Sequence, residues 1–198
     1  MNSMTTINGQ IRFLKHQDEF IQPLSDRSSK DQLDAFNQAL IEVRQDIEVS
    51  KTLLMLSNPV LQDVLTFYQT ILSDPVMIEA VVELIQHSLL TASSAVDAYF
   101  SQQVTNLFEH NPYFQARKDD LLDVKNRLLN ALYGNYSKPI SIKTYHEPTL
   151  LVCDRLWVYE LAKMDLTNVK AVVCQEGSTH SHVAIILASY GIPFFIVR

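Results

Sequence analysis

Glycine is scarce in this chain of 198 residues, which has four: Gly9, Gly134, Gly177 and Gly191. Neither a G-x-x-x-x-G-K phosphate loop nor a G-x-G-x-x-G dinucleotide fingerprint can be written, and a collagen-like or glycine-rich composition is excluded. Two cysteines, Cys153 and Cys174, are too few for a disulfide framework. Hydrophobic residues make up 47% of the chain and charged residues 19%, which is the composition of an ordinary globular protein.

Basic side chains and long apolar runs are also in short supply. The chain has 16 basic and 22 acidic residues, a net charge of −6, which argues against a nucleic-acid partner. The longest apolar runs, such as VAIILA at 183–188, fall far short of the roughly 18 residues of a membrane-spanning helix. The opening residues lack the apolar stretch of a signal peptide. We therefore expect a cytoplasmic protein that binds neither membrane nor nucleic acid.

Hydrophobic periodicity divides the chain into three zones. Residues 7–22 alternate loosely and predict one or two short strands. Residues 28–133 have a helical pattern throughout, whereas residues 139–198 return to a strand-rich α/β pattern. We expect an α/β subdomain made of residues 1–25 and 137–198, with a helical subdomain of residues 28–135 inserted into it.

Five helices are predicted in the middle zone. The first begins at Ser28 or Ser29 and carries a buried stripe made of Leu33, Phe36, Leu40, Val43 and Ile47. Asn-Pro and Asp-Pro breaks separate the others, at about 60–72, 76–90, 93–109 and 113–132. Ser93 or Ser94 would cap the fourth helix and Gly134 would end the fifth. Such short connections favour an antiparallel bundle.

Acidic side chains gather in the same zone. No lysine or arginine lies between Lys51 and Arg117. Six acids occupy that tract: Asp63, Asp74, Glu79, Glu83, Asp97 and Glu109. The tract is either an ordinary solvated surface or a docking face for a basic partner, and charge alone leaves both interpretations open.

The last zone predicts strands at 149–153 and 170–174 with a helix at 155–163 between them. Residues 182–190 predict a second helix, with Ser181 as its N-cap and Gly191 just after its end. A strand at 194–197 follows Pro193. The order strand, loop, helix, strand is that of a βαβ unit.

The loop before the second of these helices holds the candidate chemistry. His182 begins the helix at the carboxyl end of a strand, where an anion is favoured and ligands gather. A neutral imidazole there is a nucleophile toward a phosphoryl group. Hydroxyls of Ser178, Thr179 and Ser181 would bind phosphoryl oxygens, and Gly177 would allow close backbone approach. Spacing alone favours a capped helix followed by an ordinary histidine. His180 and His182, with Cys153 and Cys174 on nearby strands, also suggest a zinc site, but their spacing matches no common ligand pattern.

The segment EGSTHSHVAIILASYGIPFFIV resembles the phosphohistidine loop of phosphoenolpyruvate-utilising enzymes, whose pattern is G-G-x-T-S-H-x-x-I-x-A-R-x-x-x-I/L-P. Residues 71–85 and 113–134 resemble the helical subdomain of Enzyme I of the bacterial sugar phosphotransferase system. The order of the zones is similar too, so the resemblance covers nearly the whole chain.

The resemblance implies a fold and an activity. The fold would be an α/β phosphohistidine (swivelling) subdomain with an inserted antiparallel helical bundle. His182 would carry the phosphoryl group within a loop formed by Gly177, Ser178, Thr179, His180 and Ser181. The helical subdomain would dock the phosphocarrier protein HPr. Phosphoenolpyruvate and magnesium would bind a separate C-terminal barrel, which these residues do not include and which would also form the homodimer.

Three positions depart from the family pattern. Ser178 replaces the second glycine, His180 replaces a threonine, and Ala188 replaces an arginine that lies near the phosphoryl group. A protonated His180 is a candidate replacement for that cation. The acidic F-E-x-H step of the helical subdomain is matched here by residues 65–68, Leu-Thr-Phe-Tyr. Two alternatives therefore stand beside phosphoryl transfer: a non-catalytic carrier-binding module, and the swivelling domain of a pyruvate phosphate dikinase-type enzyme, which the helical insertion disfavours.

Overall fold

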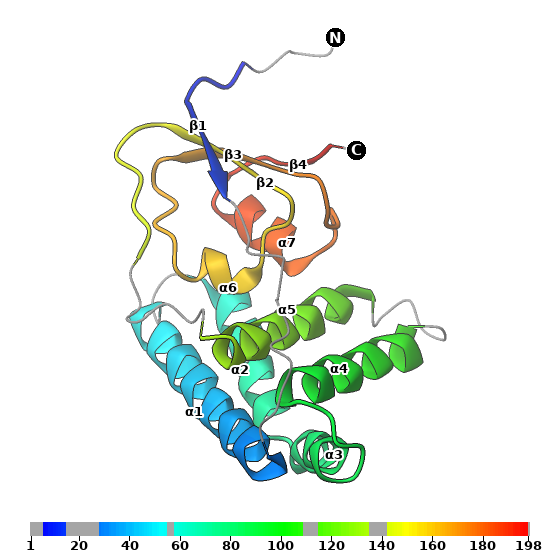
Figure 1. Ribbon diagram of the computed structural model, residues 1–198. Helices are drawn as coiled ribbons and strands as arrows, with labels where there is room; N and C mark the ends of the chain where they lie inside the picture. The colour runs from blue at the N-terminus through cyan, green and yellow to red at the C-terminus, as the bar shows by residue number, and fades with distance from the viewer. Residues whose placement is uncertain (1–5, 15–27, 55–57, 109–114, 135–141, 198) are drawn as a thin grey trace. The chain divides into compact units, whose positions relative to one another are not determined.

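The computed structural model describes residues 6–14, 28–54, 58–108, 115–134 and 142–197. The chain divides into two compact units (Figure 1). Met1–Gln17 and Ser141–Arg198 form a unit with a parallel sheet, and Asp18–Ile140 forms a helical unit. Each unit is described by itself below.

The helical unit is built from five helices within the described residues. They are α1 (Ser29–Leu54), α2 (Pro59–Ser73), α3 (Pro75–Gln86), α4 (Ala92–Phe108) and α5 (Gln115–Leu132). Proline stands at the first position of α2 and of α3, where its missing N–H costs nothing. Asn58 and Asp74 cap these two helices, because their side-chain oxygens accept hydrogen bonds from first-turn amides. Both of these X-Pro pairs thus start a helix, and Asp74 is also the residue at which α2 ends.

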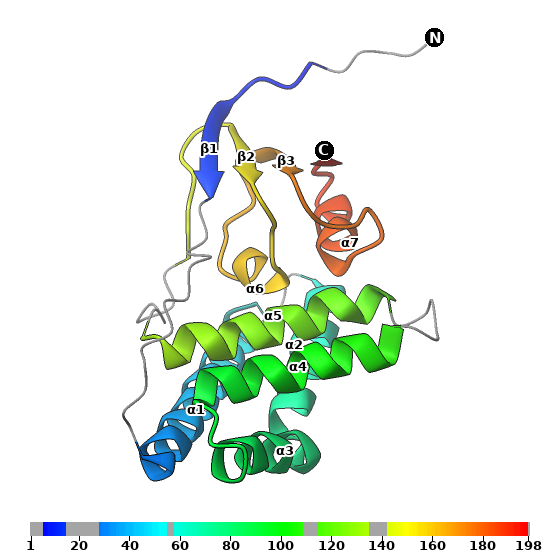
Figure 2. The same ribbon diagram turned by 45° about the vertical axis from the view of Figure 1, so that its right-hand side comes forward.

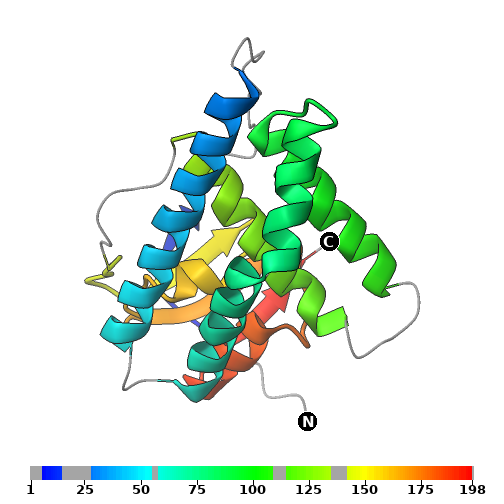
Figure 3. The ribbon, with the colours of Figure 1, turned by 90° about the horizontal axis from the view of Figure 1, so that it is seen from below.

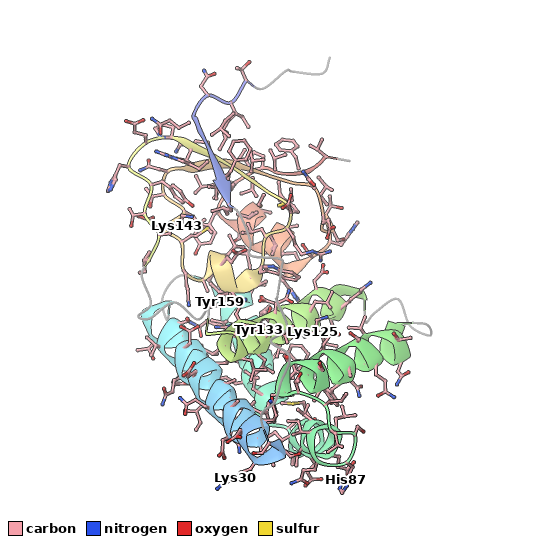
Figure 4. The ribbon with its side chains drawn as sticks, in the orientation of Figure 1. Lys30, His87, Lys125, Tyr133, Lys143 and Tyr159 are labelled. Carbon is pink, nitrogen blue, oxygen red and sulfur yellow. The ribbon has the colours of Figure 1, made fainter. Side chains whose placement is uncertain are left out.

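Helix α1 packs against each of the other four helices, and Figure 3 shows it alongside them from below. Most of its predicted stripe is buried: Phe36, Leu40, Val43 and Ile47 are at most 3% exposed. Helices α4 and α5 lie side by side (Figure 2). Lys125 of α5, labelled in Figure 4, donates to Asp97 of α4 at 2.8 Å. The apolar stripes of the sequence therefore meet in one helical core.

The helical core also contains charge, which the periodicity did not predict. Arg127 of α5 is 1% exposed and forms an ion pair with Asp46 of α1 at 2.6 Å. Asp123, one turn earlier on α5, accepts a hydrogen bond from the hydroxyl of buried Tyr68 at 2.7 Å. Burial, and secondarily the charge of Asp123, raises the pKa of Tyr68 well above its ordinary value. Side-chain hydrogen bonds thus link α5 to α1 and α2 within an otherwise apolar interior.

Two helix boundaries differ from the prediction. Helix α3 ends at Gln86 rather than near residue 90, and Leu89 beyond it has a positive φ of 52°. A left-handed backbone at a leucine cannot continue a helix. Helix α4 begins at Ala92, one residue before the predicted start, because Thr91 rather than Ser93 or Ser94 caps it: its hydroxyl accepts from the amide of Ser94 at 3.1 Å.

The other unit is a four-stranded parallel sheet in the order β1-β2-β3-β4. Its elements are β1 (Gln10–Leu14), β2 (Thr149–Cys153), α6 (Val158–Leu161), β3 (Val169–Cys174), α7 (His182–Ser189) and β4 (Phe194–Ile196). Because the strands follow one another in one direction, right-handed crossovers place α6 and α7 on the same side of the sheet (Figure 2). On the opposite side, Ile11, Phe13 and Phe195 are exposed. The βαβ unit predicted for the end of the chain is confirmed.

The helix predicted at 155–163 is wrong in length, since α6 spans only Val158–Leu161. Its start is set at Trp157, whose amide donates to the Glu160 side chain at 3.1 Å. Its end is set by an isolated parallel bridge between Lys143 and Met164, with hydrogen bonds from Lys143 to Lys163 and from Asp165 to Lys143. Long-range pairing therefore takes residues 163–165 out of the helix. Of the strands predicted in residues 7–22, β1 is present, and residues 15–22 lie outside the described part of the chain.

Candidate functional site

The candidate loop, residues 175–181, joins the carboxyl end of β3 to the start of α7 (Figure 1). Its first residues are tied to the end of β2: the amide of Gln175 donates to the carbonyl of Asp154 at 3.0 Å, and that of Glu176 donates to the same carbonyl at 2.7 Å. The Glu176 carboxylate pairs with Arg155 at 2.8 Å. The beginning of the loop is therefore held by backbone contacts between neighbouring strands and by one ion pair.

Ser178 and Ser181 hold the rest of the loop together. The Ser178 carbonyl accepts from both the amide and the hydroxyl of Ser181, at 3.1 and 2.7 Å. The Ser178 hydroxyl accepts from the amide of His180 at 3.1 Å. The Ser181 hydroxyl also accepts from the amide of Ala184, so the predicted N-cap is confirmed. Since Ser181 is 5% exposed, its hydroxyl serves to shape the loop and cap α7.

Gly177 is required by its backbone conformation. Its φ of 139° lies in the region that side-chain-bearing residues rarely adopt. A Cβ there would be 3.6 Å from the Phe194 ring, which is an ordinary contact. The reason for glycine at this position is therefore the turn itself rather than crowding.

The two histidines of the H-x-H pair lie in different settings. His180 is exposed, and its Nδ1 lies 3.3 Å from the hydroxyl of Thr179, which is also exposed. His182 is half-buried and is the first residue of α7. Only His182 therefore combines a position in the first turn of a helix with partial access to solvent.

The first turn of α7 is electrostatically suited to an anion. The first amides of any helix have no carbonyl partner within that helix, and the helix dipole adds partial positive charge there. The first turn of α7 contains no acidic residue to oppose that charge. The His182 imidazole therefore lies beside backbone amides that stabilise an anion.

A metal centre receives no support from the described residues. No group of three or more histidine, cysteine, aspartate or glutamate side chains is arranged among them to hold a metal ion. Glu160, an acid of the same unit, accepts a hydrogen bond from the Trp157 amide. The zinc interpretation of His180 and His182 therefore lacks the further ligands that it requires.

A hollow of about 660 Å³ lies at the carboxyl edge of the sheet. Cys153, Cys174, Gln175 and Glu176 are among the residues that line it. The two thiol sulfurs are 3.2 Å apart. The sequence placed both cysteines on strands, but only the strand register makes them neighbours.

The acidic tract keeps most of its charge at the surface of the helical unit. Asp63 of α2, Glu79 and Glu83 of α3, and Asp97 of α4 are exposed. Asp74 is half-buried and caps α3. Glu109 lies outside the described residues. Glu79 and Glu83 are four residues apart and so lie on one side of α3.

Two family models match the chain. The model for the N-terminal part of PEP-utilising enzymes matches residues 7–117, and that for their mobile domain matches residues 145–197, which include His182. The chain therefore belongs to the PEP-utilising enzymes, as its loop and helical zone indicated. Within the described residues, no helix combines the length and apolarity needed to span a membrane.

Curated relatives fall into two groups. The phosphoryl donor subunit DhaM of the PEP-dependent dihydroxyacetone kinase of Providencia stuartii is 33% identical over 129 residues, covering 64% of this chain and 26% of DhaM. The phosphoenolpyruvate-protein phosphotransferase of Mycoplasma pneumoniae is 28% identical over 184 residues, covering 92% of this chain and 30% of the relative. The chain thus spans between a quarter and a third of the length of these proteins.

Solved structures show the same fold. The solution structure of the Enzyme I protein nEIt superposes with a TM-score of 0.68 at 24% identity, covering 96% of this chain and 72% of that chain. The N-terminal domain of the nitrogen-type Enzyme I superposes with a TM-score of 0.62 at 20% identity, covering 93% and 76%. The resemblance to Enzyme I is therefore confirmed at the level of family and fold.

Proposed function

We propose that this chain is a phosphoryl-transfer domain that carries a phosphoryl group on His182. The observation that carries the proposal is the position of His182 in the first turn of α7, directly after the serine cap at the carboxyl edge of a parallel sheet. The curated relatives, named as phosphotransferases or phosphoryl donors, support it.

In the proposed reaction, the lone pair of a His182 ring nitrogen attacks the phosphorus of a phosphohistidine on a carrier protein. The donor P–N bond breaks, and its electron pair returns to the donor ring. One proton leaves the other nitrogen of His182 and one is taken up by the donor imidazole, so charge and atoms balance. Most of the acceleration of such transfers comes from positioning of the reacting groups and from electrostatic stabilisation of the transition state.

The loop would act on the phosphoryl oxygens in three ways. Backbone amides at the start of α7 favour the anion. The exposed hydroxyl of Thr179 and the imidazole of His180 are within reach of each other, and a protonated His180 would supply the positive charge that Ala188 cannot. Gly177, Ser178 and Ser181 would keep the loop in the shape that these contacts need.

The proposed partner is a basic, HPr-like phosphocarrier protein that docks on the helical unit. Exposed acids on α2, α3 and α4 supply complementary charge, which accelerates encounter and orients a basic surface. Substrate turnover with phosphoenolpyruvate and magnesium would require residues outside these 198. In isolation, the chain would exchange phosphoryl groups with its carrier only.

Transfer is tested by incubating the chain with radiolabelled phospho-HPr and measuring acid-labile label on the chain. We expect labelling of the unmodified protein, no labelling of His182→Ala, and unchanged labelling of His146→Ala, a matched exposed histidine of the same unit. His180→Ala should label more slowly. Label that persists in His182→Ala would contradict the assignment of the acceptor.

Docking is tested by titrating HPr into Glu79→Gln/Glu83→Gln and following binding calorimetrically at two salt concentrations. We expect weaker binding and a smaller salt dependence than in the unmodified chain, because long-range steering falls with ionic strength. Glu147→Gln, which removes an exposed charge from the sheet unit, is the control. Binding of HPr without any transfer would instead support the non-catalytic module suggested by Ser178, His180 and Ala188.

A further inference from the structure

The two cysteines of the chain form a close pair in the sheet unit. Cys153 is the last residue of β2 and Cys174 the last of β3, and the parallel register places them directly opposite each other. Their sulfurs are 3.2 Å apart, and no disulfide joins them in this structure. Two thiols at this distance lie in direct contact, close enough for a small movement to join them.

Backbone geometry at this position is compatible with a disulfide. Neighbouring strands of a sheet lie about 4.8 Å apart. Disulfides link Cα atoms that are roughly 4.4–6.8 Å apart, so the main chain is already within range. The sulfurs must approach by about 1 Å to reach bonding distance near 2 Å.

The pair has a route to small solutes despite its burial. Cys153 is 5% and Cys174 1% exposed, yet both line the hollow at the carboxyl edge of the sheet. A hollow of about 660 Å³ has ample room for a small solute such as a peroxide. The pair is therefore open to small oxidants despite the low exposure of both residues.

Contact between the thiols also activates one of them. The hydrogen bond from the Cys153 thiol lowers the pKa of Cys174, against the opposing effects of burial and of Glu160. A lower pKa increases the fraction of thiolate, which is the reactive form. Cys174 is therefore the expected first nucleophile and Cys153 the resolving thiol.

We propose that Cys153 and Cys174 are a reversible redox-modification site whose oxidant is a small hydroperoxide. The Cys174 thiolate attacks one oxygen of hydrogen peroxide, the O–O bond breaks, and a sulfenic acid forms; the departing hydroxide takes up the proton that the thiol released and leaves as water. The Cys153 sulfur then attacks the sulfenic sulfur and displaces the hydroxyl as a second water. In sum, two thiols and one hydrogen peroxide give one disulfide and two waters, and a dithiol reductant restores the pair.

The oxidised pair would alter the site loop. Gln175 directly follows Cys174, and its amide also lies 3.2 Å from the carbonyl of Cys153, so both ends of the new bond border the base of the loop. Drawing the ends of β2 and β3 together shifts this base and, through residues 176–181, the start of α7. Any effect on phosphoryl transfer rests on the proposed function, whereas formation of the disulfide does not.

The site is tested by exposing the folded chain to excess hydrogen peroxide and measuring its intact mass. Because the chain has only two cysteines, an intramolecular disulfide appears as a loss of about 2 Da that dithiothreitol reverses. Cys153→Ala and Cys174→Ala serve as matched controls. Neither variant can lose this mass. Cys153→Ala should accumulate the sulfenic acid, a gain of about 16 Da that dithiothreitol reverses, unlike the equal gain from oxidation of any of the five methionines.

A second measurement reports on the loop independently of activity. The ring resonances of His182 should shift on oxidation of the unmodified chain and stay unchanged in Cys174→Ala, which lacks the first nucleophile, when it is treated in the same way. Thiols that remain reduced in the folded chain but oxidise after unfolding would overturn the proposal. Intermolecular dimers or irreversible oxygen adducts in place of the 2 Da loss would overturn it equally. If the disulfide forms but phospho-HPr labels neither redox form, the proposed function fails and the redox site stands.

Discussion

The two units of this protein each contain an arginine–carboxylate ion pair, in very different surroundings. In the helical unit, Arg127 and Asp46 are 2.6 Å apart with side chains only 1% and 7% exposed. In the sheet unit, Arg155 and Glu176 are 2.8 Å apart with side chains 25% and 65% exposed. The same chemistry should therefore have a large effect on stability when one partner is removed in the first unit and a small effect in the second, because only a buried charge loses its hydration.

The two units also differ in where their interacting polar side chains lie. The helical unit places charge in its interior, where the Arg127–Asp46 pair and the Tyr68–Asp123 hydrogen bond join α5 to α1 and α2. In the sheet unit, the hydrogen-bonding side chains of the site gather at the carboxyl edge, in the loop that contains Glu176, the partner of Arg155. Polar groups thus organise a core in one unit and a candidate site in the other.

The largest expected effect comes from breaking the buried pair. Arg127→Met should destabilise the helical unit by about 3–5 kcal/mol, since Asp46 is left charged and buried. Urea unfolding followed by far-UV circular dichroism measures it, because most helical residues belong to this unit. The double variant Arg127→Met/Asp46→Leu should recover part of the loss. A single variant as stable as the parent would show that the pair contributes nothing.

Tyr68→Phe is expected to have the next largest effect. At neutral pH it removes the donor to buried Asp123 and should cost about 1–3 kcal/mol. Because burial raises the folded-state pKa of Tyr68, the stability linked to its protonated form is fully present below the unfolded pKa near 10 and is lost as the pH rises through the folded value. As the pH rises above 10, the free energy of unfolding should therefore decrease less in Tyr68→Phe than in the parent. Tyr190→Phe, an exposed tyrosine of the other unit, is the control.

Removing the cap of α7 should have a smaller effect, confined to the sheet unit. Ser181→Ala eliminates the hydroxyl that accepts from the Ala184 amide and donates to Ser178, at a cost of about 1 kcal/mol. Trp157, the single tryptophan of the chain, lies in this unit and reports its unfolding by fluorescence. Ser181→Thr should retain most of the stability. An equal loss in the threonine variant would assign the effect to packing instead of capping.

The smallest effect is expected for the exposed ion pair. Arg155→Met should change the stability of the sheet unit by about 0–1 kcal/mol, since Glu176 remains hydrated without its partner. Thermal unfolding of the parent and the variant, at low and high salt, measures it. A loss as large as that of Arg127→Met would contradict the explanation by burial and would give Arg155 a structural role in the loop.

Much of this structure follows from local patterns. Asn58-Pro59 and Asp74-Pro75 place two helix boundaries because proline has no amide to donate and the preceding side chain caps. The helical period of 3.6 residues predicts the buried stripe from Phe36 to Ile47. Short apolar runs predict the strands that end at Cys153 and Cys174. Ser181 and Gly191 mark the ends of α7 by cap chemistry.

Where prediction failed, distant residues decided the outcome. Helix α6 is shortened because Lys143 pairs with residues 163–165, and no local pattern in 155–163 contains that information. Asp123 and Arg127 are four residues apart and therefore lie on the same side of α5. The sequence does not show that this side is buried, because their partners belong to α1 and α2. The position of the site loop was predictable, whereas the bonds that shape it were not.

By itself, the sequence determined the order of helices and strands, the cap that starts α7 and the family to which the chain belongs, because these depend on side chains a few residues apart. Tertiary structure alone decided that Arg127 meets Asp46 and that the two thiols touch. Those contacts join residues 81 and 21 positions apart, and chain folding, rather than local conformational preference, sets such distances.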